Sequence, residues 1–178
     1  TMMGESFHTL ERLAEFAQEH KIKIVFNPST YLAEKGSRHL MHIINKTDLL
    51  ILNKEEACLV VGQGTMEGLL FKLKSLAPKI VVITDGKNDL YVIDEKYVYT
   101  AKPPFIKVVD ATGAGDAFAA SFLSGLIRKN DIVFAVKLGM VNAMSVITHY
   151  GAKNILLTFK EAMKAISKLK MKVHKKKI

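Results

Sequence analysis

Residues 110–118 read Asp-Ala-Thr-Gly-Ala-Gly-Asp-Ala-Phe, between a β-branched run and a long apolar segment. Gly113 and Gly115, separated by one small residue, let the backbone turn sharply and expose successive N–H groups. Those groups would lie at the N-terminus of a helix, where the macrodipole favours anions. The pattern predicts a strand, an anion-binding loop and a helix. Asp116, in the first turn, is either a functional carboxylate or an acid that only satisfies the dipole.

Upstream of this loop, three short apolar runs predict buried strands at residues 21–26, 48–52 and 79–84. Helices are predicted from the spacing of apolar residues at 5–20, 37–46, 55–61 and 66–76. Continuous apolar strands that alternate with helices are typical of a parallel sheet covered by helices on both faces.

The pattern changes after residue 88. Three alternating segments predict an antiparallel meander at residues 89–94, 96–100 and 105–109. Helices are then expected at residues 114–129, 131–149 and 159–170. The sequence therefore predicts one mixed α/β domain over residues 1–170, followed by a basic tail at 171–178.

The composition excludes several classes of protein. Of the 178 residues, 49% are hydrophobic and 24% are charged, which excludes a disordered or low-complexity chain. Cys58 is the only cysteine, so an internal disulfide and a cysteine-rich zinc site are excluded and a cytoplasmic location is expected. No apolar run approaches the roughly 18 residues of a membrane span, and we expect no membrane partner.

The net charge of +9 is concentrated near the end of the chain. Residues 160–178 contain eight lysines and one acid, a net charge of +7 that leaves +2 for the remainder. A specific nucleic-acid site would interleave aromatic side chains with its basic residues, and residues 170–178 contain no aromatic residue. We therefore expect a solvated last helix and a frayed tail, with non-specific contact to nucleic acid or to an acidic surface as the alternative.

A second glycine cluster, Gly62-Gln-Gly-Thr-Met-Glu-Gly68, also precedes a predicted helix. A dinucleotide-binding fingerprint would need its third glycine where the sequence has Glu67, and an acid at that position would face the pyrophosphate. We predict a loop between two helices here. A P-loop motif does not occur in the sequence.

Residues 110–118 resemble the second signature of the ribokinase (PfkB-type) family of carbohydrate kinases, D-x-T-G-A-G-D-x-F. Three further stretches resemble family motifs in the family's order: Asn53–Glu56 (N-x-x-E), Thr84–Gly86 (T-x-G) and Ser145–Ala152, the helix and Gly-Ala turn near the family's C-terminus. The resemblance covers essentially residues 1–158, with the spacing intact.

The resemblance implies a ribokinase-like, doubly wound α/β fold with a mostly parallel sheet flanked by helices. Residues 1–4 lead directly into a helix, and the chain has no counterpart of the family's Gly-Gly sugar signature or substrate lid. We therefore expect an incomplete domain, the C-terminal part of a larger fold, which is inactive by itself and a homo-oligomer when complete. Two positions depart from the family pattern: Asp89, where a second glycine is common, and Ser121, near which glycine or alanine is common.

The activity that the resemblance implies is ATP-dependent phosphoryl transfer to a hydroxyl group of a sugar or nucleoside. Asp116 would be the catalytic base that accepts the proton of the attacking hydroxyl. The backbone N–H groups of Gly113, Ala114, Gly115 and Asp116 would form the anion hole for the transferring group.

By the same resemblance, Asn53 and Glu56 would order Mg²⁺ beside the phosphates of ATP, through water. The same two residues also fit a helix capping box, and both roles can hold together. Thr84 and Gly86 would contact the phosphates and the ribose, and Asn142 would line the adenine pocket.

Asp110 resembles the family's ligand for a monovalent cation, so K⁺ is a second expected ion. Carbonyl groups near Ala111, His149 and Gly151 would complete that site. Asp110 also fits the simpler role of a turn residue that bonds its own backbone.

Two other functions stay open at this point. One is a nucleotide-binding module without catalysis, because the substrate lid is missing. The other is a protein that binds nucleic acid through its basic tail. The position of Asp116 within its glycine loop favours the kinase over this second alternative. The expected substrate is a small molecule, either a sugar or a nucleoside.

Overall fold

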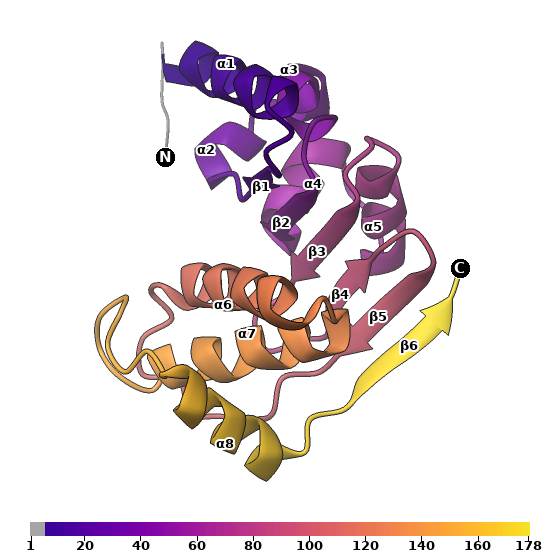
Figure 1. Ribbon diagram of the computed structural model, residues 1–178. Helices are drawn as coiled ribbons and strands as arrows, with labels where there is room; N and C mark the ends of the chain where they lie inside the picture. Colours follow the sequence, from indigo (N-terminus) through magenta and orange to yellow (C-terminus); the bar gives the residue numbers. More distant parts are fainter. Residues whose placement is uncertain (1–5) are drawn as a thin grey trace. The chain divides into compact units, whose positions relative to one another are not determined.

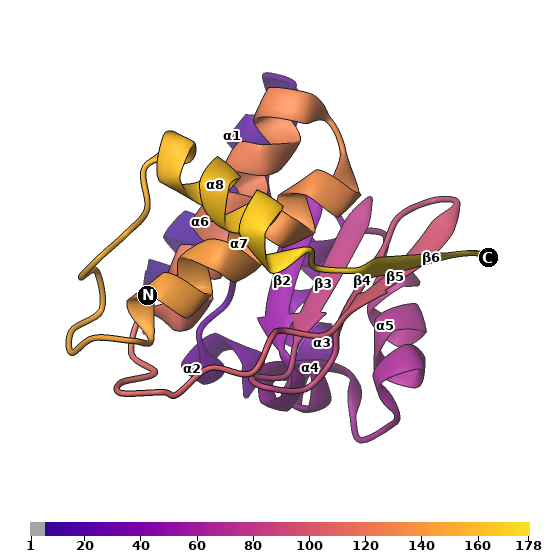
Figure 2. The ribbon, with the colours of Figure 1, turned by 90° about the horizontal axis from the view of Figure 1, so that it is seen from below.

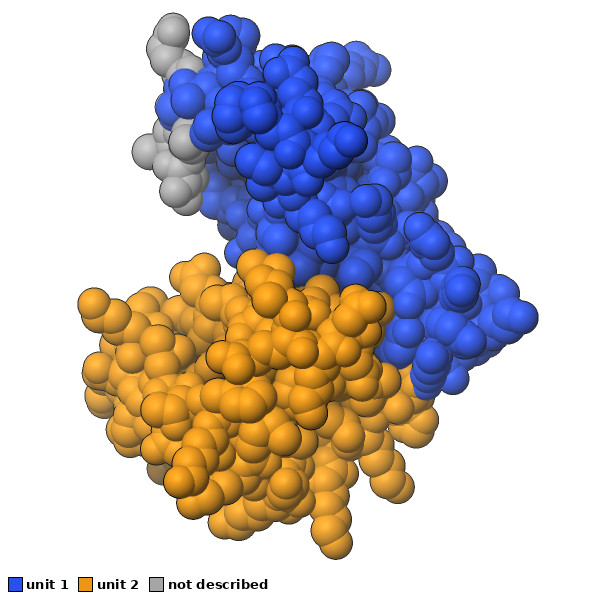
Figure 3. Space-filling view, in the orientation of Figure 1, with its two compact units in different colours: residues 1–86, 90–100, 175–178 blue, residues 87–89, 101–174 orange. Residues whose placement is uncertain are grey.

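The computed structural model describes residues 6–178, which form two compact units (Figure 3). Unit 1 comprises the residues up to 86 together with 90–100 and 175–178, and unit 2 comprises residues 87–89 and 101–174. Residues 1–4, which were expected to lead directly into a helix, lie outside the described residues. The same holds for Glu5, the predicted first residue of that helix.

A mixed sheet of six strands has the order β1-β2-β3-β4-β5-β6 (Figures 1 and 2). The strands are β1 Val25–Phe26, β2 Leu49–Asn53, β3 Ile80–Thr84, β4 Leu90–Ile93, β5 Tyr97–Ala101 and β6 Val173–Lys177. β1, β2 and β3 are parallel, and β4 is antiparallel to β3. The three predicted parallel strands are confirmed, but β1 covers only Val25–Phe26 of the predicted residues 21–26. The first two strands of the predicted meander are also confirmed.

Five helices lie within the described part of unit 1: α1 Ser6–Glu19, α2 Thr30–Ala33, α3 Gly36–Ile44, α4 Lys54–Val61 and α5 Met66–Lys74. Apolar side chains of helices and strands form one core in which Leu40, Leu50, Leu70 and Ile83 are fully buried. The short helix α2 was not predicted. The second glycine cluster begins in the loop between α4 and α5, as predicted.

Unit 2 contains the helices α6 Ala114–Lys129, α7 Ile132–Val146 and α8 Phe159–Leu169 (Figure 1). Glycines let α6 and α7 approach closely, since a Cβ on Gly125 would lie 2.7 Å from the Cα of Ala135. A Cβ on Gly139 would lie 2.9 Å from the ring of Phe118. None of the helices within residues 6–178 has the length and hydrophobicity that crossing a membrane requires.

The prediction of a third meander strand at residues 105–109 is wrong. Residues 102–108 have no regular secondary structure, and Phe105 is fully exposed. Two consecutive prolines before it supply no N–H group for a strand ladder. The N–H of Val109 instead donates to the carbonyl of Ile147, just past the end of α7, at 2.8 Å.

The frayed tail predicted at residues 171–178 is also wrong, since its middle forms strand β6 beside β5. The Ile178 N–H donates to the carbonyl of Lys96 at 3.0 Å. Lys175 Nζ lies 3.7 Å from the ring centroid of Tyr97 in β5. Lysines on an edge strand hinder pairing with a further strand, so the basic composition fits an edge strand as well as a solvated tail.

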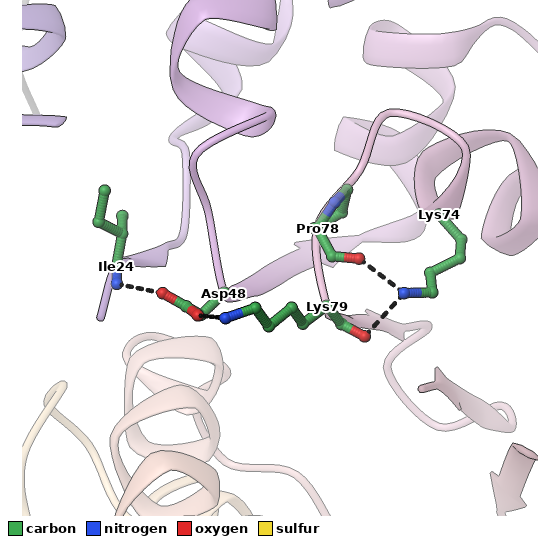
Figure 4. A network of polar contacts seen from close by, with 5 residues as sticks. All are labelled: Ile24, Asp48, Lys74, Pro78 and Lys79. Atoms are coloured by element: carbon green, nitrogen blue, oxygen red, sulfur yellow. Dashed lines mark hydrogen bonds and ion pairs between the residues drawn. The ribbon is translucent and has the colours of Figure 1, made fainter. Parts of the chain in front are cut away.

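Asp48, just before β2, links the amino ends of the parallel strands (Figure 4). Its Oδ2 accepts the N–H of Ile24 at 2.9 Å, and its Oδ1 accepts Lys79 Nζ at 2.7 Å. Lys74 Nζ donates to the carbonyls of Pro78 and Lys79. Burial alone would raise the pKa of Asp48, but the hydrogen bonds from Lys79 and Ile24 outweigh it and hold the pKa below its ordinary value of 3.8.

Asp48→Asn should therefore reduce stability in a pH-dependent way. A carboxylate whose pKa is lowered by folding stabilises the protein above its unfolded pKa, and this contribution is lost as the pH falls through the folded pKa. We expect the wild type to be more stable by about 1 kcal/mol at pH 7. The difference should shrink below about pH 4. Urea unfolding at several pH values measures it, and a difference that does not change with pH would contradict this role of Asp48.

Candidate functional site

The carboxyl ends of β2 and β3 bring two predicted site residues together. Asn53 ends β2, Thr84 ends β3, and the two are register partners in the parallel pair. Gly86 follows two residues later with a φ of +55°, a conformation that favours glycine. Ligands of open α/β sheets bind beyond the carboxyl ends of the strands. These three residues therefore lie at the edge where a ligand is expected.

Asn53 and Glu56 form the capping box that the sequence predicted. The Glu56 N–H donates to Asn53 Oδ1 at 2.8 Å, and the Asn53 N–H donates to Glu56 Oε2 at 2.9 Å. Glu56 is only 8% exposed, and burial raises its pKa against the opposing hydrogen bonds from Asn53 and Thr30. Its other oxygen, Oε1, accepts a long contact of 3.5 Å from the Thr30 hydroxyl. Capping therefore leaves Oε1 as the oxygen that could serve a cation.

Two contacts at this edge were missed by the sequence analysis. One is the contact of Thr30 with Glu56, and the other is an ion pair of 3.2 Å between Lys54 Nζ and Asp85 Oδ2. Lys54 and Asp85 each directly follow a predicted site residue at the end of a parallel strand. That position in the sequence was the signal that could have identified them.

In unit 2, Gly113 is the N-cap of α6, with a φ of +80°. A Cβ at this position would lie 2.1 Å from the carbonyl oxygen of Ala152, so the loop accepts only glycine here. The space around Gly115 is open, since a Cβ there would meet no atom within 4 Å. The two glycines therefore have different roles. Gly113 permits a close approach of two backbone segments, and Gly115 leaves open space at the helix N-terminus.

The predicted anion hole is partly used by the loop itself. The Ala114 N–H donates to the carbonyl of Ala111 at 3.2 Å. The N–H groups of Gly115 and Asp116 have no carbonyl one turn earlier within the helix. Asp116 is exposed in the same turn. Gly115 and Asp116 are thus the residues whose N–H groups the helix leaves for an anion.

Asp110 fastens this loop to the segment that follows α7. Its Oδ1 accepts the N–H of Thr112 at 2.9 Å, which confirms the predicted turn role, and its Oδ2 accepts the N–H of Gly151 at 3.0 Å. The hydrogen bonds from Thr112 and Gly151 lower the pKa of Asp110. His149 lies two residues before Gly151, and its Nδ1 is 2.8 Å from Thr148 Oγ1.

The side-chain amide of Asn142 joins three segments of unit 2. Its Nδ2 donates to Ser121 Oγ of α6 at 2.7 Å, and its Oδ1 accepts the N–H of Leu157 at 2.9 Å. Ser145, one turn later in α7, donates from Oγ to the carbonyl of Ile155 at 2.7 Å. Both ends of the Asn142 amide are therefore engaged, one with α6 and the other with the segment between α7 and α8.

The predicted residues fall into both units. Those near the ends of β2 and β3 belong to unit 1, and those around the α6 N-terminus and the α7–α8 segment belong to unit 2. Within residues 6–178, no three carboxylate, histidine or cysteine side chains gather as a metal cage. Magnesium sites in phosphate-binding proteins commonly use one or two carboxylates together with the phosphates, and such a site needs no cage.

Gly113→Ala should disrupt the loop, because the added methyl group overlaps the Ala152 carbonyl and the φ is unfavourable for alanine. We expect a loss of about 1–3 kcal/mol in unfolding free energy. The Gly151 amide resonance in NMR spectra should also shift as its bond to Asp110 is disturbed. Gly115→Ala is the matched control and should leave both readouts near those of the wild type. Equal effects of the two substitutions would contradict this account of the loop.

The comparisons with known proteins agree on one family. The profile described as pfkB family carbohydrate kinase matches residues 6–158. A cytidine kinase of Thermococcus kodakarensis is 31% identical over 137 residues, which are 74% of this chain and 48% of that protein. A ribokinase of Bacillus subtilis is 28% identical over 160 residues, 89% of this chain and 51% of that protein.

The crystal structure of a ribokinase from Thermotoga maritima has a TM-score of 0.76 with this chain at 23% sequence identity. The match covers 89% of this chain and 53% of that one. The expected ribokinase-like α/β fold is therefore confirmed. The chain spans about half the length of the relatives that it matches.

Proposed function

The chain belongs to the pfkB family of carbohydrate kinases, and on that premise we propose that the whole protein transfers a phosphoryl group from ATP to a hydroxyl group of a sugar or nucleoside. One relative is a cytidine kinase and another a ribokinase, which supports both classes of acceptor. The observation that carries the proposal is the start of α6, where a glycine N-cap, first-turn N–H groups and an exposed carboxylate occur together.

In the proposed reaction, Asp116 accepts the proton of the acceptor hydroxyl as its oxygen attacks the γ-phosphorus. The bond from that phosphorus to the bridging oxygen breaks, and ADP leaves. The N–H groups of Gly115 and Asp116, with Gly113 and Ala114 shaping the turn, would stabilise charge on the transferring group. Phosphoryl transfer depends mainly on such positioning and electrostatic stabilisation, and a helix N-terminus supplies both without reorganisation.

The edge formed by β2 and β3 would hold the nucleotide and its metal. Glu56 and Asn53 fit a magnesium role because carboxylate and amide oxygens are ligands that Mg²⁺ accepts, and because the capping box fixes their orientation. Magnesium, when bound, would neutralise phosphate charge. A nearby cation would also lower the raised pKa of the buried Glu56 carboxylate. Thr84 and Gly86, at the same edge, would contact the phosphates and ribose.

Asp110 is proposed to bind a monovalent cation, together with carbonyl groups near Ala111, His149 and Gly151. Each carboxylate oxygen accepts one N–H group, so lone pairs remain on both. The proposed effect of this ion is to fix the loop at the α6 N-terminus. Asn142 would contribute to the adenine pocket by holding its wall, since its amide is engaged with α6 and Leu157.

Asp116→Asn tests the proposed base. We expect kcat of the whole protein to fall by about 10²–10⁴-fold while the affinity for ATP is retained, because the amide cannot accept the proton. ADP release is measured with ribose, fructose 6-phosphate, cytidine and adenosine as acceptors. Glu67→Gln, which changes an exposed acid in the first turn of α5, is the matched control and should keep the wild-type rate. An unchanged kcat in Asp116→Asn would exclude Asp116 as the catalytic base. A wild type that binds ATP but does not turn over would instead favour a nucleotide-binding module.

The two proposed ion sites should separate in titrations. Glu56→Gln should raise the Mg²⁺ concentration needed for half-maximal activity and lower kcat, since it weakens the ligand beside the phosphates. Asp110→Ala should weaken activation by K⁺ and leave the Mg²⁺ dependence unchanged, because its effect passes through the loop. A shift of only the Mg²⁺ curve in Asp110→Ala, or a wild type that K⁺ does not activate, would leave Asp110 as a turn residue.

A further inference from the structure

Lys54 occupies a position that does not suit a cation. It is the first residue of α4, and the N-terminus of a helix carries a positive partial charge. The next two residues, Glu55 and Glu56, have the sign that this position favours. Lys54 Nζ lies 3.2 Å from Asp85 Oδ2, and the two side chains are 43% and 23% exposed. A partly exposed ion pair contributes little to stability, so the pair alone gives a weak reason for lysine here.

The pair lies at the edge where a nucleotide is expected. Asn53 and Thr84 are register partners at the ends of β2 and β3, and Lys54 and Asp85 are the residues that follow them. The pair therefore connects the loop of the capping box with the loop that contains Gly86. Two lysines follow the ends of the parallel strands, Lys54 and Lys87, and Lys54 is the one that directly follows a strand end.

A second pair joins the same two strands at their opposite, amino edge. Lys79 Nζ and Asp48 Oδ1 are 2.7 Å apart, and Asp48 also accepts the N–H of Ile24 (Figure 4). This pair belongs to a network that joins strands, and it lies at the edge where ligands of open α/β sheets do not bind. It provides an internal control, because it has the same residue types on the same strands.

We propose that Lys54 binds the phosphates of the nucleotide, and that Asp85 holds its ammonium group beside the site until the nucleotide enters. This proposal deepens the proposed function and rests on it. The lysine side chain is flexible and carries three donors. A polyphosphate carries more negative charge than one carboxylate and offers strong acceptor oxygens, so the exchange of partners favours the nucleotide. Lys54 is thus paired with Asp85 in the absence of nucleotide and binds the phosphates when the nucleotide is present.

The test is calorimetric titration of the full chain with ATP in the presence of Mg²⁺, and separately with adenosine, which has no phosphate. Lys54→Met removes the charge and keeps most of the apolar stem, and Lys54→Arg restores a cation. Asp85→Asn removes the partner and leaves Lys54 available. Lys79→Met removes the corresponding cation at the amino edge. Thermal unfolding of each variant reports any change in folding.

We expect Lys54→Met to weaken ATP binding about tenfold, the effect of losing a hydrogen bond between charged groups. Lys54→Met should leave adenosine binding unchanged. Lys54→Arg should recover most of the ATP affinity, Asp85→Asn should match or exceed the wild type, and Lys79→Met should bind ATP as the wild type does. If Lys54→Met and Asp85→Asn each lose ATP binding and adenosine binding equally, the ion pair has only a structural role. In that case the proposal for Lys54 would be wrong, and the proposed function would stand. A wild type that binds no nucleotide would overturn both.

Discussion

The parallel register of β2 and β3 is the constraint on which the site in unit 1 depends. Leu49 pairs with Ile80 at one end of the two strands, and Asn53 therefore pairs with Thr84 at the other end. Because the strands are parallel, both end at the same edge of the sheet. A slip by one residue would turn each buried side chain to the opposite face. Ion pairs link the same two strands at both edges, Asp48 with Lys79 at the amino edge and Lys54 with Asp85 at the carboxyl edge.

Unit 2 depends instead on close backbone approach. Gly125 and Gly139 let α6 and α7 pack together, and Gly113 lets the loop before α6 contact the carbonyl of Ala152. Asp110 then joins the same loop to Gly151 through its carboxylate. The helix N-terminus that we propose as an anion hole is therefore held from the side by a second loop, which is the kind of support that a preorganised site requires.

The start of α4, in unit 1, contains two groups that folding alone does not favour. Glu56 is a buried carboxylate with a raised pKa, and Lys54 is a cation at a helix N-terminus. Conflicts between local preference and observed residue are expected at functional sites, where a ligand supplies the missing charge. A magnesium ion beside Glu56 and phosphates beside Lys54 would remove both conflicts.

The sequence by itself determined the parallel strands, most of the helices, the capping box of Asn53 and Glu56, and the turn of Asp110. Each of these depends on residues that are near in the chain or on burial that a continuous apolar run already implies. The tertiary structure decided the rest. The segment at residues 105–109 has the alternation of a strand but finds no partner, whereas the lysine-rich end becomes a strand because β5 offers it a free edge. The contacts of Lys54 with Asp85 and of Asn142 with Ser121 join residues 31 and 21 positions apart. Such pairs follow from which backbones lie side by side, and local sequence preferences do not contain that information.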